Sequence, residues 1–100
     1  MRPLRYADLS AAGCALLRAA PADRPALLTR LLSEADAADA YRRRTGRLHP
    51  LWGNGALAAP AMAHPLAREP FLDDPDYAAC LALICAAMID RAGQGGGNPS

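Results

Sequence analysis

The sequence predicts an all-α protein, built as a small bundle of three main helices. Its 100 residues contain no valine, two isoleucines and two threonines. Strands are built mainly from β-branched and aromatic residues, so this composition disfavours a sheet. Alanine supplies 24 residues and buries little area, so the core must rest on the 15 leucines and a few larger side chains. A chain of this length makes one domain. We expect residues 1–92 to form it and the glycine-rich residues 93–100 to be a flexible tail.

The first main helix is expected over residues 7–20. Leu9, Ala12, Leu16, Leu17 and Ala20 recur at the spacing of one helical face. Asp8 lies in the first turn, where the helix dipole favours an anion. Pro21 is expected to end the helix.

The second main helix is expected over residues 23–45. Pro25 is tolerated in its first turn. The apolar stripe is Leu28, Leu31, Leu32, Ala35 and Ala38. Asp39 precedes Arg42 and Arg43 by three and four residues, so it can pair with both. Gly46 is suited to the position just after a helix end.

Residues 46–70 are expected to form an irregular connection with one short helix, at residues 56–63. Prolines at positions 50, 60, 65 and 70 come too close together for a long helix. Asn54 is the candidate cap of the short helix. The connection is expected to wrap around the core, anchored by Leu48, Leu51, Trp52, Leu57 and Met62.

The last main helix has the clearest start in the chain. Asp74 is a cap residue, Pro75 fits the first helical position, and Gly93 is expected to end the helix. Its wide apolar face indicates a helix covered on more than one side. We expect the second and last helices to bury Leu31, Leu32, Leu81, Ile84 and Met88 between them.

Several classes of function find no support in the sequence. His49 and His64 lack further ligands at metal-binding spacing, and no phosphate-binding glycine loop is present. The three cysteines form no CxxC pair and fit reduced core positions. No signal peptide or run of about 20 apolar residues occurs. We therefore expect a cytoplasmic protein that has no catalytic residues, cofactor, metal, membrane association or small-molecule substrate.

The strongest candidate for a functional surface is the string "DAYRRRTGRLHPLWGNG". It places Arg42, Arg43, Arg44 and Arg47 at the end of the second helix. Three interpretations stay open. The arginines can offset the helix dipole and pair with Asp39, they can bind phosphates without sequence preference, or they can bind a protein. The net charge of +1 does not favour strong DNA binding. Trp52 is either a loop anchor or a binding residue.

An acidic counter-surface is expected at Glu69, Asp73 and Asp76, which surround the start of the last helix. The arginines should lie near these carboxylates, either within one chain or across two copies. Opposite charges at two helix ends invite head-to-tail pairing.

Two strings, "DAADAYRRRTGRLHPLWGNGAL" and "EPFLDDPDYAACLAL", resemble short proteins encoded beside the large terminase of alphaproteobacterial gene transfer agents. These agents are phage-like particles that package host DNA. The resemblance covers about residues 2–92. It implies a small terminase-like subunit, which is helical, oligomeric and non-enzymatic and which works with the large terminase subunit. Phage small terminases usually carry an N-terminal helix-turn-helix. This chain lacks basic residues at recognition positions in its first helices, which argues against sequence-specific DNA binding.

The expected function is therefore that of an oligomeric DNA-packaging accessory protein that recruits or regulates the large terminase. Its expected partners are that subunit, further copies of itself, and DNA bound weakly and without sequence preference. The alternative is a small helical regulator or scaffold that binds a protein and has no nucleic-acid role.

Overall fold

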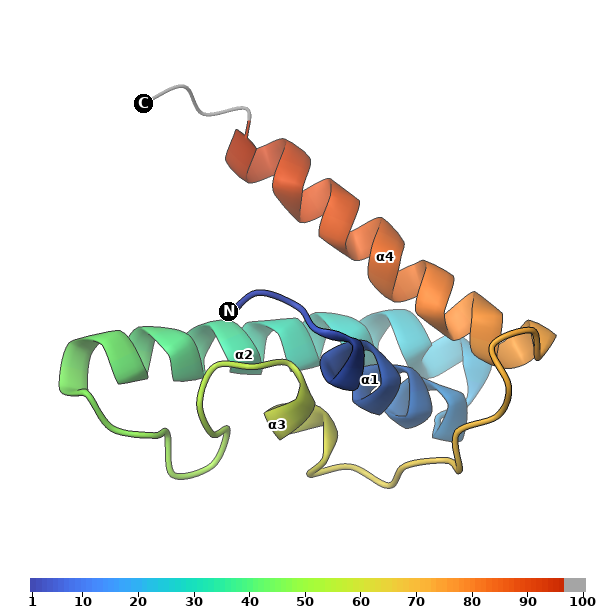
Figure 1. Ribbon diagram of the computed structural model, residues 1–100, viewed down its shortest axis with the longest axis horizontal. Coiled ribbons are helices and arrows are strands. Elements are labelled where there is room, and N and C mark those ends of the chain that lie inside the picture. Colours follow the sequence, from blue (N-terminus) through green and yellow to red (C-terminus); the bar gives the residue numbers. More distant parts are fainter. Residues whose placement is uncertain (97–100) are drawn as a thin grey trace.

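The computed structural model describes residues 1–96 and consists of helices joined by loops (Figure 1). The elements are α1 (Tyr6–Arg18), the 3-10 turn η1 (Pro21–Asp23), α2 (Arg24–Thr45), α3 (Ala58–Ala61) and α4 (Pro75–Gly96). Residues 1–96 contain no strand, and their one β-bridge joins His49 to Gly53. The predicted all-α bundle of three main helices and one short helix is confirmed.

The helix signals at the end of α2 and the start of α4 act as predicted. Gly46 has a left-handed φ of 72°, and its N–H donates to the Arg42 carbonyl oxygen at 2.8 Å. The Asp74 carboxylate accepts hydrogen bonds from the N–H groups of Asp76 and Tyr77, at 3.1 and 3.0 Å. These bonds satisfy backbone groups that a helix end leaves without partners.

Other helix boundaries differ from the prediction. The first helix ends at Arg18 rather than at residue 20, and residues 21–23 form η1. The short helix spans only Ala58–Ala61, and its first N–H donates to Asp8 of α1 at 3.0 Å. Asn54 accepts instead from the N–H of Ala56. The bond to Asp8 joins residues 50 positions apart, so local spacing could not predict it.

The predicted end of the last helix at Gly93 is wrong, because α4 continues through Gly96. A glycine weakens a helix by about 1 kcal/mol relative to alanine but does not forbid it. Residues 93–96 are therefore helical and not part of a tail. The rest of the predicted flexible tail, residues 97–100, lies outside the described residues.

Helix α1 is the centre of the fold. It contacts α2, α3 and α4, whereas α2 and α4 share few contacts with each other. In Figure 1 the start of α4 lies near α1, and its C-terminal part leaves the body of the molecule. Gly13 allows the two helices to pack closely, because a Cβ at that position would lie 2.8 Å from a methyl group of Leu81 and 3.0 Å from the Tyr77 ring.

The core forms around α1 rather than between α2 and α4. Its largest fully buried side chains include Leu16, Leu31, Leu57, Tyr77 and Ile84. The expectation for the core holds for Leu31, Leu32 and Ile84, which are buried. It is wrong for Leu81 and Met88, which are only half-buried. The reason is that α4 rests mainly on α1 and shares few contacts with α2, so the expected interface between α2 and α4 is small.

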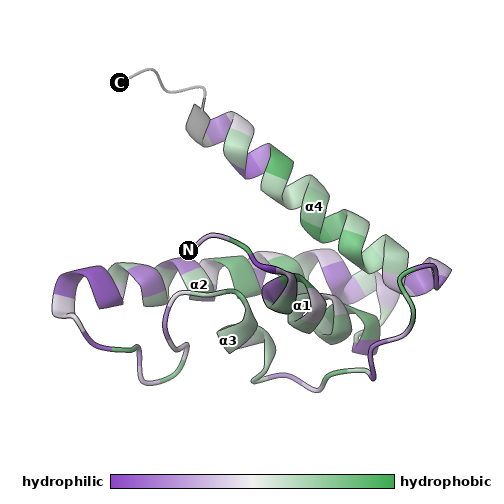
Figure 2. Ribbon diagram, viewed as in Figure 1, coloured by the Kyte–Doolittle hydropathy of each residue, from purple (hydrophilic) through white to green (hydrophobic). Residues whose placement is uncertain are grey.

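Polar and apolar residues are divided unevenly along the two long helices (Figure 2). Hydrophilic residues gather at the C-terminal end of α2, while α4 is hydrophobic over much of its length. The molecule measures 39 × 33 × 22 Å. The end of α2 and the start of α4 lie at opposite ends of this long axis (Figure 1). These two ends carry the arginine cluster and the acidic counter-surface that were predicted from the sequence.

Candidate functional site

The end of α2 is organised around Asp39, which is buried. Its carboxylate lies 3.0 Å from the Arg42 guanidinium and 3.1 Å from that of Arg43, as the spacing predicted. The hydrogen bond from Arg42 is the main cause that lowers the pKa of Asp39. Gly55 packs directly on this residue, since a Cβ at Gly55 would lie 2.7 Å from the Asp39 Cβ. Asp39 therefore joins the helix end to the loop that follows it.

Only part of the arginine cluster remains available to a partner. Arg42 is half-buried, and its Nε is buried with no hydrogen-bond partner among the atoms of residues 1–96. Arg43 keeps 73% of its side chain exposed although it reaches Asp39. Arg44 and Arg47 are exposed. Arg42 therefore supports the helix end, while the other three face solvent.

An aromatic stack shapes the loop beside these arginines. The rings of His49 and Trp52 are parallel, with centroids 4.6 Å apart, and Tyr41 meets the His49 ring edge-on at 5.1 Å. The Arg44 guanidinium lies 5.6 Å from the Tyr41 ring centroid, within the range of a cation–π contact. Trp52 is thus half-buried against His49 and is not inserted into the core.

Backbone hydrogen bonds hold the same loop in one shape. His49 and Gly53 exchange N–H···O bonds of 2.8 and 3.1 Å. The His49 Nδ1 accepts from the N–H groups of Leu51 and Trp52, both at 3.1 Å. Gly53 has a φ of 76°, which glycine adopts readily. The loop is therefore rigid enough to present its side chains in a fixed arrangement.

Two leucines of this loop are exposed instead of anchoring it. Leu51 is 73% exposed and Leu48 is 64% exposed, contrary to the expected anchoring roles. Met62 is also exposed, and of the five proposed anchors only Leu57 is fully buried. The aromatic stack and the hydrogen bonds fix the loop, so its leucines are not needed in the core. We call Arg43, Arg44, Arg47, Leu48 and Leu51 the arginine–leucine surface.

The predicted acidic residues lie at the other end of the molecule and have different roles. Asp76 accepts two hydrogen bonds from the Arg24 guanidinium, at 2.8 and 3.3 Å. Arg24 is itself buried and also donates to the Leu16 carbonyl oxygen. The hydrogen bond from Arg24 lowers the pKa of Asp76. Asp76 therefore fastens α4 to α1 and α2.

Glu69 accepts hydrogen bonds from two tyrosines. The hydroxyl of Tyr77 donates at 2.6 Å and that of Tyr6 at 2.9 Å. These bonds lower the pKa of Glu69, with Tyr77 the larger cause. Burial, followed by the bond to Glu69, raises the pKa of Tyr77. The cluster fixes the segment that enters α4.

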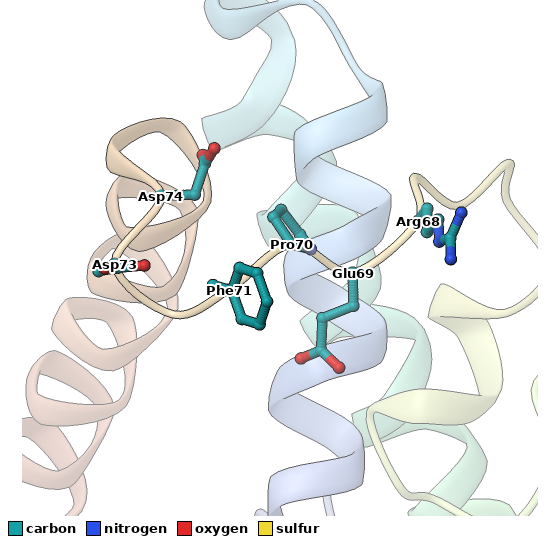
Figure 3. A pocket seen from close by; sticks show the side chains of 6 residues that line it. All are labelled: Arg68, Glu69, Pro70, Phe71, Asp73 and Asp74. Carbon is teal, nitrogen blue, oxygen red and sulfur yellow. The ribbon is translucent and has the colours of Figure 1, made fainter.

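The turn between Glu69 and α4 surrounds an open cavity of about 800 Å³ (Figure 3). Its lining residues are Arg68, Glu69, Pro70, Phe71, Asp73 and Asp74. The Asp74 N–H donates to the Phe71 carbonyl oxygen at 3.0 Å and closes the turn. Phe71 is 86% exposed at the tip. We call residues 69–74 the acidic turn.

Sequence reasoning found the local contacts and missed the distant ones. It predicted that Asp39 pairs with Arg42 and Arg43. It also expected the arginine cluster near Glu69, Asp73 or Asp76, and within one chain that pairing does not form, because the two groups lie at opposite ends (Figure 1). The acidic residues were predicted, but the part of Phe71 in this turn was not; its place as the single phenylalanine between Glu69 and Asp73 was the signal available in the sequence.

The sequence profile of a family described as "Domain of unknown function (DUF7742)" matches residues 2–88. The chain belongs to this family. The matched range contains both the arginine–leucine surface and the acidic turn. No curated protein and no solved structure matches the chain.

Among the residues that the structure describes, no three His, Cys, Asp or Glu side chains are grouped so that they could hold a metal ion. Within residues 1–96, no helix has both the length and the apolar character needed to cross a membrane.

Proposed function

We propose that this family member is a non-enzymatic accessory protein that binds another protein through its arginine–leucine surface. The observation that carries the proposal is the exposure of Leu48 and Leu51 on a rigid loop beside three exposed arginines. Apolar residues that gather in one exposed patch are typical of an interaction site. Arginine next to aromatic residues is also enriched where binding energy concentrates.

The chemistry of this surface favours an acidic partner with apolar residues. The guanidinium groups would face carboxylates, and Leu48 and Leu51 would become buried at the centre of the contact. Together with the sequence resemblance, this supports a large terminase subunit as the partner and a small terminase-like role in DNA packaging in the cytoplasm. A regulator that binds a different protein by the same surface is the alternative.

Binding of DNA through this surface would differ from binding of a protein in its salt dependence and in its need for the leucines. Three exposed arginines can neutralise at most three phosphates, which gives a log–log salt slope of about −3 and no sequence preference. Phosphates would not require the leucines. Leu51 therefore distinguishes the two kinds of partner, since only a protein contact gains from burying it.

The test is capture of the purified large terminase subunit by the wild type and by two variants, with a DNA mobility shift in parallel. Arg43, Arg44 and Arg47 are replaced by alanine in the first variant, and the second is Leu51→Ser. We expect both to lose capture by at least about tenfold, which corresponds to about 1.4 kcal/mol. Leu51→Ser should leave any DNA binding unchanged.

The matched control replaces Arg2, Arg18 and Arg30, which are exposed elsewhere, by alanine. It alters the net charge equally and should capture the subunit as the wild type does. Capture that is unaffected in both test variants would refute the proposed surface. Nucleotide or nucleic-acid hydrolysis by the pure protein would refute the non-enzymatic role.

A further inference from the structure

The acidic turn is held with its apolar side chains in solvent. Hydrogen bonds from Tyr6 and Tyr77 fix Glu69 at its start, and Asp74 caps α4 at its end. Between these fixed points Phe71 is 86% exposed and Leu72 57% exposed. Both ends of the turn are anchored, so this exposure is a property of its folded shape.

Carboxylates surround these apolar residues. Asp73 and Asp74 lie on one side of Phe71 and Glu69 on the other, around the cavity of about 800 Å³ (Figure 3). Asp73 is exposed, and no ion pair or hydrogen bond to its side chain occurs within residues 1–96. An aromatic ring beside carboxylates suits a guanidinium group, which can lie on the ring and pair with the acid.

We propose that the acidic turn is a docking site for the arginine–leucine surface of a second copy of this chain. The two surfaces are complementary in charge and alike in having exposed apolar residues at their centres. Phe71 and Leu72 would contact Leu48 and Leu51 of the second copy. The carboxylate of Asp73 would face its exposed arginines.

The positions of the two surfaces require that the contact forms between copies. They lie at opposite ends of a molecule whose longest dimension is 39 Å (Figure 1). A single chain therefore cannot bring them together. The contact is head-to-tail, which leaves one free surface of each kind on every pair and allows further copies to add.

Self-association goes beyond the proposed function, and it also affects that function because both use the arginine–leucine surface. The arginine–leucine surface can hold either a second copy or the large subunit, so self-association and partner binding compete. The two surfaces consist of five and six residues, whereas each side of a stable interface usually contributes about 20–30 residues. We therefore expect a dissociation constant between about 1 μM and about 1 mM.

The test is sedimentation of the full chain across that concentration range, using charge-reversed variants. The basic variant is Asp73→Arg, and the acidic variant combines Arg44→Glu with Arg47→Glu. None of these side chains takes part in the hydrogen bonds or ion pairs that hold the described helices together. We expect each variant alone to associate at least about tenfold more weakly than the wild type.

Mixing the two variants gives the decisive result. The basic variant keeps an intact arginine–leucine surface and the acidic variant keeps an intact acidic turn, so the mixture should form a complex. Raising the salt to about 1 M shortens the screening length from about 10 to about 3 Å and should weaken all of these complexes. Asp90→Arg and Arg18→Glu, at exposed positions elsewhere, are the matched controls and should associate normally.

Three outcomes would overturn the inference: a monomeric wild type up to about 1 mM, association that survives in both variants, or no complex in the mixture. A variant that fails to fold is identified by its circular dichroism, and Phe71→Ser then replaces Asp73→Arg. Failure here leaves the proposed function intact, because Asp73→Arg and Phe71→Ser should still capture the large subunit. Failure of Leu51→Ser to affect that capture would count against the proposed function alone.

Discussion

At the scale of single residues, polar groups buried against α1 hold the helices in place. The Tyr77 side chain is fully buried and ends in a hydrogen bond of 2.6 Å to Glu69. Arg24 is buried and joins α1 and α2 to Asp76 of α4. A buried polar group stabilises a fold only when its hydrogen bonds are made, so these contacts fix one arrangement of the helices.

Tyr77→Phe should destabilise the protein by about 1 kcal/mol, because it removes a hydrogen bond to a carboxylate and keeps the packing of the ring. Chemical denaturation followed by circular dichroism measures the change. Tyr6 donates to the same Glu69 oxygen from an exposed position, so Tyr6→Phe is the control and should have a smaller effect. Equal effects of the two changes would mean that burial of the Tyr77 hydroxyl is unimportant.

At the scale of elements, the close packing of α1 and α4 depends on Gly13. The place of a missing Cβ is filled by the side chains of Leu81 and Tyr77. Glycine is a poor residue for the middle of a helix, and close contact between helices is the physical reason for it here. This packing sets the direction of α4 and with it the place of the acidic turn.

Gly13→Ala should therefore destabilise the protein, by up to about 2 kcal/mol. The added methyl group forces Leu81 and Tyr77 to move, at a cost of about 1–3 kcal/mol, and the gain in helix propensity offsets about 1 kcal/mol. Thermal and chemical denaturation measure the difference. Gly93→Ala is the matched control, since a Cβ there meets nothing within 4 Å. It should stabilise the protein, so a change of the same sign at both positions would contradict this account.

At the scale of the whole molecule, charged and polar contacts connect segments that are far apart in the chain. The carboxyl groups of Asp39, Asp76 and Glu69 all have pKa values lowered by hydrogen bonds in the fold. Tyr77 has its pKa raised, by burial first and then by Glu69. Stability should therefore depend on pH in both acid and alkali.

The loss of stability in acid follows from the lowered pKa values of these three carboxyl groups. These carboxylates stabilise the folded state above their unfolded pKa values of about 4, and the contribution is lost as the pH falls through the folded values. Tyr77 acts in the opposite direction. Its stabilising contribution is complete below an unfolded pKa of about 10 and is lost as the pH rises beyond it.

The expected profile is a plateau of melting temperature between about pH 5 and pH 9, with a decrease on either side. Scanning calorimetry across this range measures it. Asp76→Asn should lower the plateau and make the acid limb shallower, while Tyr77→Phe should make the alkaline limb shallower. A melting temperature that stays constant down to about pH 2 would contradict the assignment of these contacts.

Local features of the molecule could be predicted because they depend on residues near in sequence. The scarcity of β-branched residues determined the all-α class. Asp74 and Pro75 determined where α4 begins, Gly46 determined where α2 ends, and the spacing of Asp39 determined its ion pairs. Each of these involves residues within about one turn of a helix, whose relative positions the helix itself sets.

The arrangement of the candidate surfaces was decided by tertiary structure. The ion pair of Arg24 with Asp76 spans 52 positions, and the hydrogen bond of Tyr6 with Glu69 spans 63. Helix propensity and periodicity carry no information about which helix lies at the centre. That depends on the close approach at Gly13, which sets α4 on α1 and carries the acidic turn to the end of the molecule opposite the arginines. Pairing these charges within one chain was therefore excluded by the packing of the helices, although the sequence alone permitted it.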